Sequence, residues 1–511
     1  MSETPVSIGI AQRHIVVAGL APRHVVPMKL FVLNTLYKHK LEKQGSKFVR
    51  VPDKPYASAN ANATVWRFHK NSLEAVKEHL RSRGIAFTES HVPMPRAAKV
   101  RMIKNTEKVP YENQPIVIDY LTGEKPVSKL VELQTGKGKT FSTLYSILGK
   151  EMRTGIIVSK MYLSIWMDDI PKTIKINKSL RELMVVKSSK DLNNLIAYSG
   201  TKEYERNTKI ICFTTGVMNA YCKAFKENYR SDEYDCPPWE LFDRLGIGIK
   251  VVDEVHKNFH QNFMMDLWLD YQQSINLSAT MDSSDDEQNR YYQLAFPKNE
   301  RCPHIPYDKF IEVVDYRYYL GTNVKINTKQ RGMGTYSHVQ FEESVMRVSR
   351  YVMAYMNIIC EVAKTEFFDI RDPEEKLLIL CSTKKFAKML QVYMQKRYPN
   401  EKVGTYLQED SYDVLEKYSI SISTVMSAGT GVDIPGLRTN IMTQALGSKQ
   451  SNEQCLGRTR KFLTKPKEHR PRFVFLTCQD IAKHKEYAMR KHDYFSDKSF
   501  CINVYNSGYR I

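Results

Sequence analysis

Long hydrophobic runs are missing from this sequence. No run approaches the roughly 20 apolar residues that a membrane-spanning helix needs, so we expect no contact with the membrane interior. The first ten residues lack a basic segment ahead of an apolar core, so no secretory signal is expected there. Internal repeats and low-complexity tracts are also absent, which argues against a repeat or fibrous architecture.

Cysteine is sparse and scattered. The chain has 9 cysteines in 511 residues, with no C-x-x-C pair and no His/Cys cluster at the spacing of zinc ligands. This distribution argues against both a disulfide framework and a structural zinc site. It is typical of reduced thiols, so we expect a cytoplasmic protein.

Basic charge, in contrast, is abundant. The formal net charge is +20 at pH 7, from 76 lysines and arginines against 56 acidic residues. A polyanionic partner is the simplest reason for such an excess, and nucleic acid is the first candidate. The alternative is a generally basic surface without a specific partner.

The length and the pattern of elements predict several domains. A chain of 511 residues exceeds one typical hydrophobic core. Residues 1–105 are predicted as a small basic α+β domain, either an accessory nucleic-acid-binding domain or, equally, a solvated basic face. Beyond it, short apolar runs alternate with helical segments, which predicts doubly wound α/β domains with parallel sheets over residues 106–300 and 301–511.

Local periodicity gives three further expectations, all tested below. Residues 27–41 are apolar with interleaved basic residues and predict a helix. Residues 339–365 carry one continuous apolar face and predict a single long helix. Residues 281–335 and the polar end of the chain are expected to be largely irregular.

A glycine-bearing loop between a predicted strand and a predicted helix indicates phosphate binding. It reads T-G-K-G-K-T, from Thr135 to Thr140, although Leu133 stands where the full pattern has glycine. Gly136 and Gly138 allow backbone N–H groups to face a polyphosphate. Lys139 is expected to reach the β- and γ-phosphates and the Thr140 hydroxyl to ligate Mg²⁺. The alternative is a lysine-rich surface loop.

Acidic and hydroxyl side chains follow two other predicted strands. Asp253 and Glu254 come directly after a buried strand, where charge is costly without a function or a partner. Asp253 is placed to hold Mg²⁺ and Glu254 to orient and deprotonate a water molecule. Ser278 and Thr280 end the next strand, with His256 as their natural partner. A charged strand end with no role is the alternative.

Two more segments are candidate nucleotide contacts. Gln114 lies upstream of the phosphate loop, and a glutamine amide can donate to and accept from the edge of adenine. An ordinary polar residue near a helix start is an equally good interpretation. Gln454, Arg458, Arg460 and Lys461 lie in or just after a predicted helix, where arginines suit phosphate recognition. A basic helix facing solvent or nucleic acid is the alternative.

The order of these motifs resembles that of superfamily 2 helicases, the DEAD/DEAH-type nucleic-acid-dependent ATPases. The resemblance implies two RecA-like domains with ATP and Mg²⁺ between them, and Lys139, Thr140, Asp253, Glu254 and Gln114 in the roles given above. Its remaining implications concern six further residues: Ser278 and Thr280 would couple hydrolysis to nucleic-acid movement, Gly431 and Asp433 would touch ribose and strand, and Gln454 would act with Arg458. The position of the family's second arginine is occupied here by Lys461. Because lysine lacks the planar guanidinium group, we prefer Arg460 as the arginine finger that contacts the phosphates.

The size, the basic N-terminal domain and the D-E-x-H box are similar to those of phage recombination helicases of the UvsW type. That narrower resemblance implies a DNA helicase or translocase that acts on branched DNA in recombination, repair or replication. We expect it to act as a monomer. Three alternatives stay open: an RNA helicase of the same superfamily, a translocase that moves on duplex DNA without unwinding it, and a non-catalytic nucleic-acid-binding protein.

Overall fold

The chain forms two compact units, each described here by itself. The structure is a computed structural model. It describes residues 5–511 except 45–46, 135, 228–230, 284, 331–333, 408–409, 411–412, 429–433, 463 and 467. Unit 1 comprises Met1–Leu133 and Lys137–Ile305, and unit 2 comprises Gln134–Gly136 and Pro306–Ile511. The predicted breaks after residues 105 and 300 give a finer division, which stays a prediction. Among the described residues, no helix is both long and apolar enough to cross a bilayer.

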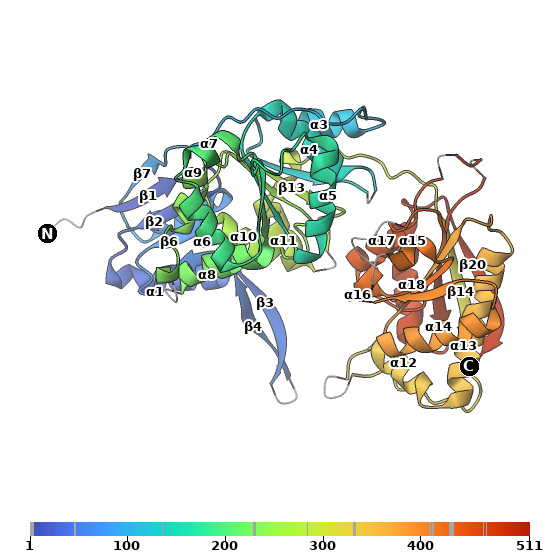
Figure 1. Ribbon diagram of the computed structural model, residues 1–511. Helices are drawn as coiled ribbons and strands as arrows, with labels where there is room; N and C mark the ends of the chain where they lie inside the picture. Colours follow the sequence, from blue (N-terminus) through green and yellow to red (C-terminus); the bar gives the residue numbers. More distant parts are fainter. Residues whose placement is uncertain are drawn as a thin grey trace. The chain divides into compact units, whose positions relative to one another are not determined.

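Unit 1 begins with a mixed five-stranded sheet. Its strand order is β5-β6-β2-β1-β7, with β1 parallel to β7 and the other pairs antiparallel. A separate two-stranded ribbon, β3–β4, leaves this sheet and extends away from the rest of the unit (Figure 1). The elements are β1 (Val6–Ile10), β2 (His14–Ala18), α1 (Pro22–Thr35), β3 (Tyr37–Gln44), β4 (Lys47–Pro55), β5 (Ala57–Ala59), β6 (Trp66–His69), α2 (Leu73–Ser82) and β7 (Phe87–His91).

The second part of unit 1 is a six-stranded sheet in which every pair of neighbours is parallel. Its order is β10-β11-β9-β12-β13-β8. The strands are β8 (Ser128–Glu132), β9 (Thr154–Val158), β10 (Leu183–Val186), β11 (Ile210–Thr214), β12 (Ile249–Val252) and β13 (Gln273–Ser278). The helices are α3 (Gln114–Thr122), α4 (Lys139–Lys150), α5 (Leu163–Thr173), α6 (Ser189–Tyr198), α7 (Lys202–Asn207), α8 (Thr215–Lys226), α9 (Pro238–Leu245), α10 (Phe259–Asp266) and α11 (Asp286–Ala295).

Both faces of the parallel sheet are buried, as expected for largely apolar strands such as β9 and β11. Alternate residues of one strand enter different cores: Ile156 packs with α3, α4 and α5, whereas Ile157 packs with α8 to α11. The second of these cores also contains the N-terminal sheet, for example Ile8 and Phe68. Within it, the buried Arg13 lies 3.5 Å from Asp266. The N-terminal sheet and the parallel sheet therefore share one core.

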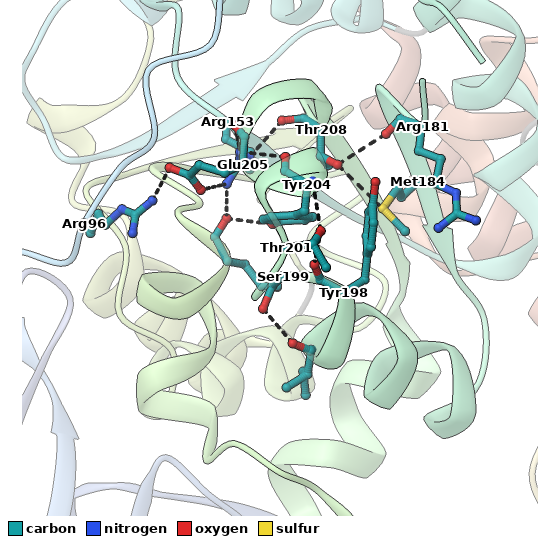
Figure 2. Close-up of polar contacts among 12 residues, drawn as sticks. Arg96, Arg153, Arg181, Met184, Tyr198, Ser199, Thr201, Tyr204, Glu205 and Thr208 are labelled. Atoms are coloured by element: carbon teal, nitrogen blue, oxygen red, sulfur yellow. Dashed lines mark hydrogen bonds and ion pairs between the residues drawn. The ribbon is translucent and has the colours of Figure 1, made fainter. Parts of the chain in front are cut away.

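A buried arginine fastens the edge of the sheet where the strands begin. Arg153, just before β9, is fully buried and donates to the carbonyl oxygens of Thr208 at 2.8 Å, Leu245 at 2.7 Å and Glu205 at 3.0 Å. Its guanidinium lies 4.4 Å from the ring of Tyr204 (Figure 2). These bonds hold α7 and the end of α9 against β9. They also occupy the guanidinium, so this buried cation has a structural role.

We expect Arg153→Met to destabilise unit 1 by about 3 kcal/mol, because three buried carbonyls lose their donor. Urea unfolding measures the change. The matched control is Arg96→Met, because Arg96 also pairs with Glu205 but is largely exposed. The control is expected to cost less than about 1 kcal/mol. Equal losses in the two variants would contradict the role given to Arg153.

Unit 2 is built on a seven-stranded sheet in which all neighbours are again parallel. Its order is β16-β17-β15-β18-β19-β14-β20. The strands are β14 (Glu312–Tyr319), β15 (Lys376–Cys381), β16 (Val403–Tyr406), β17 (Ile420–Thr424), β18 (Leu437–Met442), β19 (Arg472–Cys478) and β20 (Cys501–Arg510). The helices are α12 (His338–Met346), α13 (Ser349–Ala363), α14 (Lys384–Arg397), α15 (Asp413–Lys417), α16 (Val425–Ala428), α17 (Lys449–Leu456) and α18 (Ala482–Phe495). The prediction of two parallel-sheet α/β domains after a small N-terminal α+β part is confirmed.

Two helix predictions were wrong in their extent. The helix expected over 339–365 is split, because Val348 adopts an extended conformation (φ −121°, ψ 112°) between α12 and α13. The apolar periodicity continues across the break, so the pattern did not register it. The helix expected over 27–41 is α1, which begins earlier, at Pro22, and ends at Thr35. The remaining residues start β3, where lysines and a leucine pair with β4.

The expected irregular stretches contain regular elements. Residues 281–335 include α11 and β14, and the end of the chain forms α18 and β20. β14 pairs with β19 and β20, both of which come from the far end of the sequence. Local composition does not report such long-range pairing, which is why β14 and β20 were not predicted.

A polar cluster is buried beside α12 and α18 of unit 2. The Tyr336 hydroxyl lies 2.6 Å from His484 Nε2 and 2.8 Å from His338 Nδ1. His484 Nδ1 accepts from the Cys478 N–H, so its Nε2 carries the proton and donates to Tyr336, whose hydroxyl donates to His338. Burial lowers the pKa of His484 to about 3 and places that of His338 well below its usual value. Both imidazoles are therefore neutral in the folded chain.

This cluster predicts a loss of stability in mild acid. Because the folded pKa values are depressed, protons bind to these histidines on unfolding once the pH falls below about 6.5. The free energy of unfolding then falls by up to about 1.4 kcal/mol per pH unit for each histidine. Denaturant unfolding between about pH 5 and 7 measures the slope. We expect His338→Gln/His484→Gln to flatten it and His304→Gln, at an exposed histidine, to leave it unchanged.

Candidate functional site

Three of the predicted motifs lie at the same edge of the first parallel sheet. β12, β13 and β8 are neighbours, with Val252 beside Asn276 and Ser278 beside Glu132. The D-E-V-H segment follows β12, the S-A-T segment ends β13, and the phosphate loop follows β8. Because parallel strands end at one edge, residues far apart in the sequence meet there. This is the edge at which open α/β sheets bind ligands.

The phosphate loop has the backbone that its glycines were expected to allow. Gly136 and Gly138 have φ values of +85° and +80°, and Gly138 precedes the first turn of α4. The φ of Gly138 favours glycine, and a Cβ there would stand 2.3 Å from Gln114 Nε2, so Gln114 would have to move. Lys139 and Thr140 begin α4, where N–H groups and the positive end of the helix dipole favour an anion. Thr135 lies outside the described residues.

Two side chains fill the space around this loop. Lys139 Nζ donates to the Leu133 carbonyl at 3.1 Å, so its ammonium lies over the loop. Gln114 is buried at the start of α3, where Nε2 donates to the Lys137 carbonyl at 3.3 Å and Oε1 accepts from the Tyr111 N–H at 3.3 Å. The structure thus places Gln114 against the phosphate loop. Its role as an adenine reader stays a prediction.

The acidic pair faces the loop lysine. Glu254 Oε1 lies 4.0 Å from Lys139 Nζ. Asp253 accepts from Trp166 Nε1 at 2.9 Å and from the Glu254 N–H at 2.9 Å. Burial and the neighbouring Glu254 charge raise the pKa of Asp253 to about 6. Glu254 itself has a φ of +49°, a left-handed conformation that is strained in residues with a Cβ and concentrated at functional sites.

The site has the donors that a magnesium ion requires. Mg²⁺ prefers oxygen ligands and is bound through one or two carboxylates together with phosphates. Asp253 offers a carboxylate and Thr140 a hydroxyl. These groups fit the ion, and their assignment as its ligands stays a prediction.

A chain of close contacts leads from the acidic pair to the S-A-T segment. His256 Nδ1 lies 3.3 Å from Glu254 Oε2 and 2.8 Å from Ser278 Oγ. Ser278 donates its hydroxyl proton to the Thr280 carbonyl at 2.6 Å and accepts from the Thr280 N–H at 3.1 Å. Since that one hydroxyl proton is used, His256 Nδ1 must carry a hydrogen and donate to Ser278. The partnership expected between His256 and the strand-end hydroxyls is therefore present for Ser278.

The arginine set lies in unit 2 at the end of α17. Arg458 is buried, and its Nε donates to the Gln454 carbonyl one turn earlier at 3.3 Å. Arg460 donates to the Gly457 carbonyl, and Lys461 Nζ lies 3.2 Å from Asp308. The three predicted residues Gln454, Arg458 and Arg460 thus gather at the carboxyl end of one helix.

Gly431 and Asp433 lie outside the described residues. Their predicted contacts with ribose and strand therefore stay predictions.

Sequence reasoning missed Trp166. This fully buried residue of α5 donates its indole N–H to the Asp253 carboxylate. That hydrogen bond fixes the orientation of the carboxylate and of its remaining oxygen lone pairs. A signal for it exists, because a buried tryptophan needs an acceptor for its N–H. The sequence alone does not tell which strand-end carboxylate provides that acceptor.

Fold and site together define a two-unit α/β protein in which a phosphate loop, an acidic pair and a histidine–serine pair share one sheet edge. No family model matches the sequence, and no curated protein matches it. Among solved structures, the chain is similar to S. cerevisiae Dbp5 bound to RNA and ADP BeF3, with a TM-score of 0.49 and 14% identity, over 78% of this chain and 90% of that one. It is also similar to Mss116p bound to ssRNA and AMP-PNP, with a TM-score of 0.49 and 13% identity, over 77% and 74% of the two chains.

Proposed function

We propose that this chain is a nucleic-acid-stimulated ATPase that uses hydrolysis to move along or separate nucleic-acid strands. One observation carries the proposal. Contacts run without interruption from Lys139, through Glu254 and His256, to Ser278 at the end of β13. A phosphate-binding lysine, a carboxylate suited to activate water and a relay away from both are what a coupled ATPase needs.

The residues divide the work of hydrolysis as follows. Lys139 exchanges the Leu133 carbonyl for phosphate oxygens, and the amides at the start of α4 bind the same anion. Glu254 accepts the proton of the attacking water. Asp253, oriented by Trp166, and Thr140 would hold Mg²⁺, which neutralises phosphate charge when bound. Proton uptake at Glu254 weakens its attraction for His256, and the change reaches Ser278 through their hydrogen bond.

The residues of unit 2 are part of the same proposal. Gln454, Arg458 and Arg460 are proposed to act on the phosphates of the same nucleotide, with Arg460 as the finger. The support is their position at one helix end, together with the planar, multiply donating guanidinium group. Gly431 and Asp433 are proposed to contact the ribose and the nucleic-acid strand. Thr135 is proposed to contact the nucleotide as part of the phosphate loop.

The net charge of +20 supports a polyanionic substrate. Within that class, branched DNA unwound by a monomer is the narrower proposal, and duplex RNA is the alternative. The test is ATP hydrolysis and strand separation on forked DNA, four-way junctions and RNA duplexes under identical salt. Faster turnover and unwinding on the branched DNA would support the DNA proposal, and a preference for RNA would overturn it. Triplex displacement without strand separation would instead identify a duplex translocase.

A further inference from the structure

The β3–β4 ribbon is an exposed feature of unit 1. It projects from the N-terminal sheet (Figure 1), and Leu41 and Val49 on it are 71% and 40% exposed. Residues 37–55 contain six lysines and arginines, Lys38, Lys40, Lys43, Lys47, Arg50 and Lys54, against the two acidic residues Glu42 and Asp53. Lys40 and Lys54 are exposed. Within the ribbon, the structure describes the side chains of residues 37–42 and 49–55.

The base of the ribbon is held by α11. Lys38 Nζ lies 2.7 Å from Asp285 and donates to Gln288 at 3.0 Å. Glu287 accepts from the His39 N–H at 2.9 Å and also pairs with Arg50 on the opposite strand. One carboxylate therefore ties both strands of the ribbon to α11.

A second helix, α10, holds the end of β4. His260 Nε2 donates to the Pro55 carbonyl at 2.7 Å. The next residue, Tyr56, is fully buried and stacks on Tyr291 of α11 with ring centroids 3.5 Å apart. The ribbon thus ends in a junction of three segments: its own last strand, α10 and α11.

Both helices follow directly from the motifs of the candidate site. α10 begins three residues after His256, and Asn262 within it donates back to the Val255 carbonyl at 3.3 Å. α11 begins six residues after Thr280, whose hydroxyl accepts from the Asp282 N–H at 3.3 Å. Ser283 and Asn289 exchange two hydrogen bonds across the start of α11. Two short, hydrogen-bonded connections therefore link His256 and Thr280 to the helices that hold the ribbon base.

We propose that the β3–β4 ribbon inserts into duplex nucleic acid at the point of strand separation and is moved by the hydrolysis site through α10 and α11. This inference rests on the proposed function. A two-stranded β-ribbon fits a duplex groove, and exposed apolar side chains such as Leu41 and Val49 can wedge between base steps. The positive charge at Lys40 and Lys54 matches phosphate. The excess of like charge favours a polyanion over a second copy of this basic chain.

Two independent experiments on the full-length chain test the proposal. In the first, p-benzoylphenylalanine replaces Leu41 and, in a control, the exposed Leu180, and each protein is irradiated with a forked duplex of DNA or of RNA. We expect position 41 to crosslink to the nucleic acid with a yield that falls as the salt concentration rises. The yield from position 180 should be several-fold lower. This experiment needs no hydrolysis. If the wild type shows no ATPase activity, the proposed function fails, and the crosslink still decides whether the ribbon touches nucleic acid.

The second experiment separates strand separation from hydrolysis. In Lys40→Glu/Lys54→Glu we expect unwinding of the fork to fall by about tenfold, while ATPase stimulated by single strands stays within about twofold. Glu287→Gln, which loosens the ribbon base, should behave in the same way. Asp286→Asn is the matched control, since among the described residues Asp286 forms no hydrogen bond or ion pair with the ribbon.

Three results would overturn the proposal. These are the absence of crosslinks from position 41, unchanged unwinding in the double variant, and a parallel fall of ATPase and unwinding. The last would show that the ribbon contributes general binding or folding rather than strand separation.

Discussion

Replacing Lys139 with alanine is expected to reduce ATP hydrolysis by at least about a thousandfold, because a preorganised charge that stabilises phosphate in the transition state is lost. Among the described residues, the Lys139 ammonium contacts the Leu133 carbonyl and Glu254. Neither contact is needed for folding, since the lysine lies at the start of α4, outside the hydrophobic core. The unfolding midpoint should therefore stay close to that of the wild type while turnover is lost.

The matched control is Lys137→Ala, in the same loop. Lys137 Nζ pairs with Glu112 at 3.0 Å, and its side chain has no proposed role in hydrolysis. We expect turnover within about twofold of the wild type for this surface change. Steady-state phosphate release with saturating single strands measures both variants. Comparable losses at the two positions would show that the loop is merely sensitive to substitution, and retained turnover in Lys139→Ala would remove the basis of the nucleotide assignment.

Glu254→Gln is expected to separate binding from hydrolysis. Glutamine has the size of glutamate but cannot accept the proton of water, so we expect turnover to fall by about 100- to 10,000-fold. Binding of ATP should persist or tighten, since the carboxylate repels phosphate. The variant should therefore hold nucleotide and nucleic acid together without releasing phosphate. Filter binding of labelled ATP and single-turnover hydrolysis measure the two effects.

The chain offers a control with the same residue and the same backbone conformation. Glu151, at the end of α4, is exposed and has a φ of +50°, close to the +49° of Glu254. Glu151→Gln should hydrolyse ATP at the wild-type rate. If Glu254→Gln also hydrolyses at that rate, another group is the base, and the assignment of Glu254 is wrong.

Much of the site was predictable because its parts are local motifs at strand ends. The T-G-K-G-K-T loop, the D-E-V-H segment and the S-A-T segment each follow a strand that periodicity also identified. The rule that parallel strands end at one edge then brings Lys139, Glu254 and Ser278 together without knowledge of the strand order. The order itself, with β12, β13 and β8 adjacent, came only from the structure.

The features that the sequence did not predict depend on long-range contacts. Trp166 reaches Asp253 across the fold, and β14 pairs with strands from the end of the chain. The first residues of β3, 37–41, were predicted as the end of a helix, because their lysines and apolar residues also fit a helical period. Their place in a ribbon is set by pairing with β4 and by the carboxylate of Glu287. Local patterns carry neither kind of information.

The central claim is that a nucleotide is hydrolysed at the edge formed by β8, β13 and β12, and that nucleic acid controls the rate. The most direct measurement is steady-state ATP hydrolysis by the wild-type chain with Mg²⁺, with and without single-stranded DNA or RNA, at several salt concentrations. We expect a low basal rate that rises at least about tenfold with nucleic acid and declines as salt weakens the phosphate contacts. No hydrolysis with any nucleic acid, or a rate indifferent to its presence, would contradict the account.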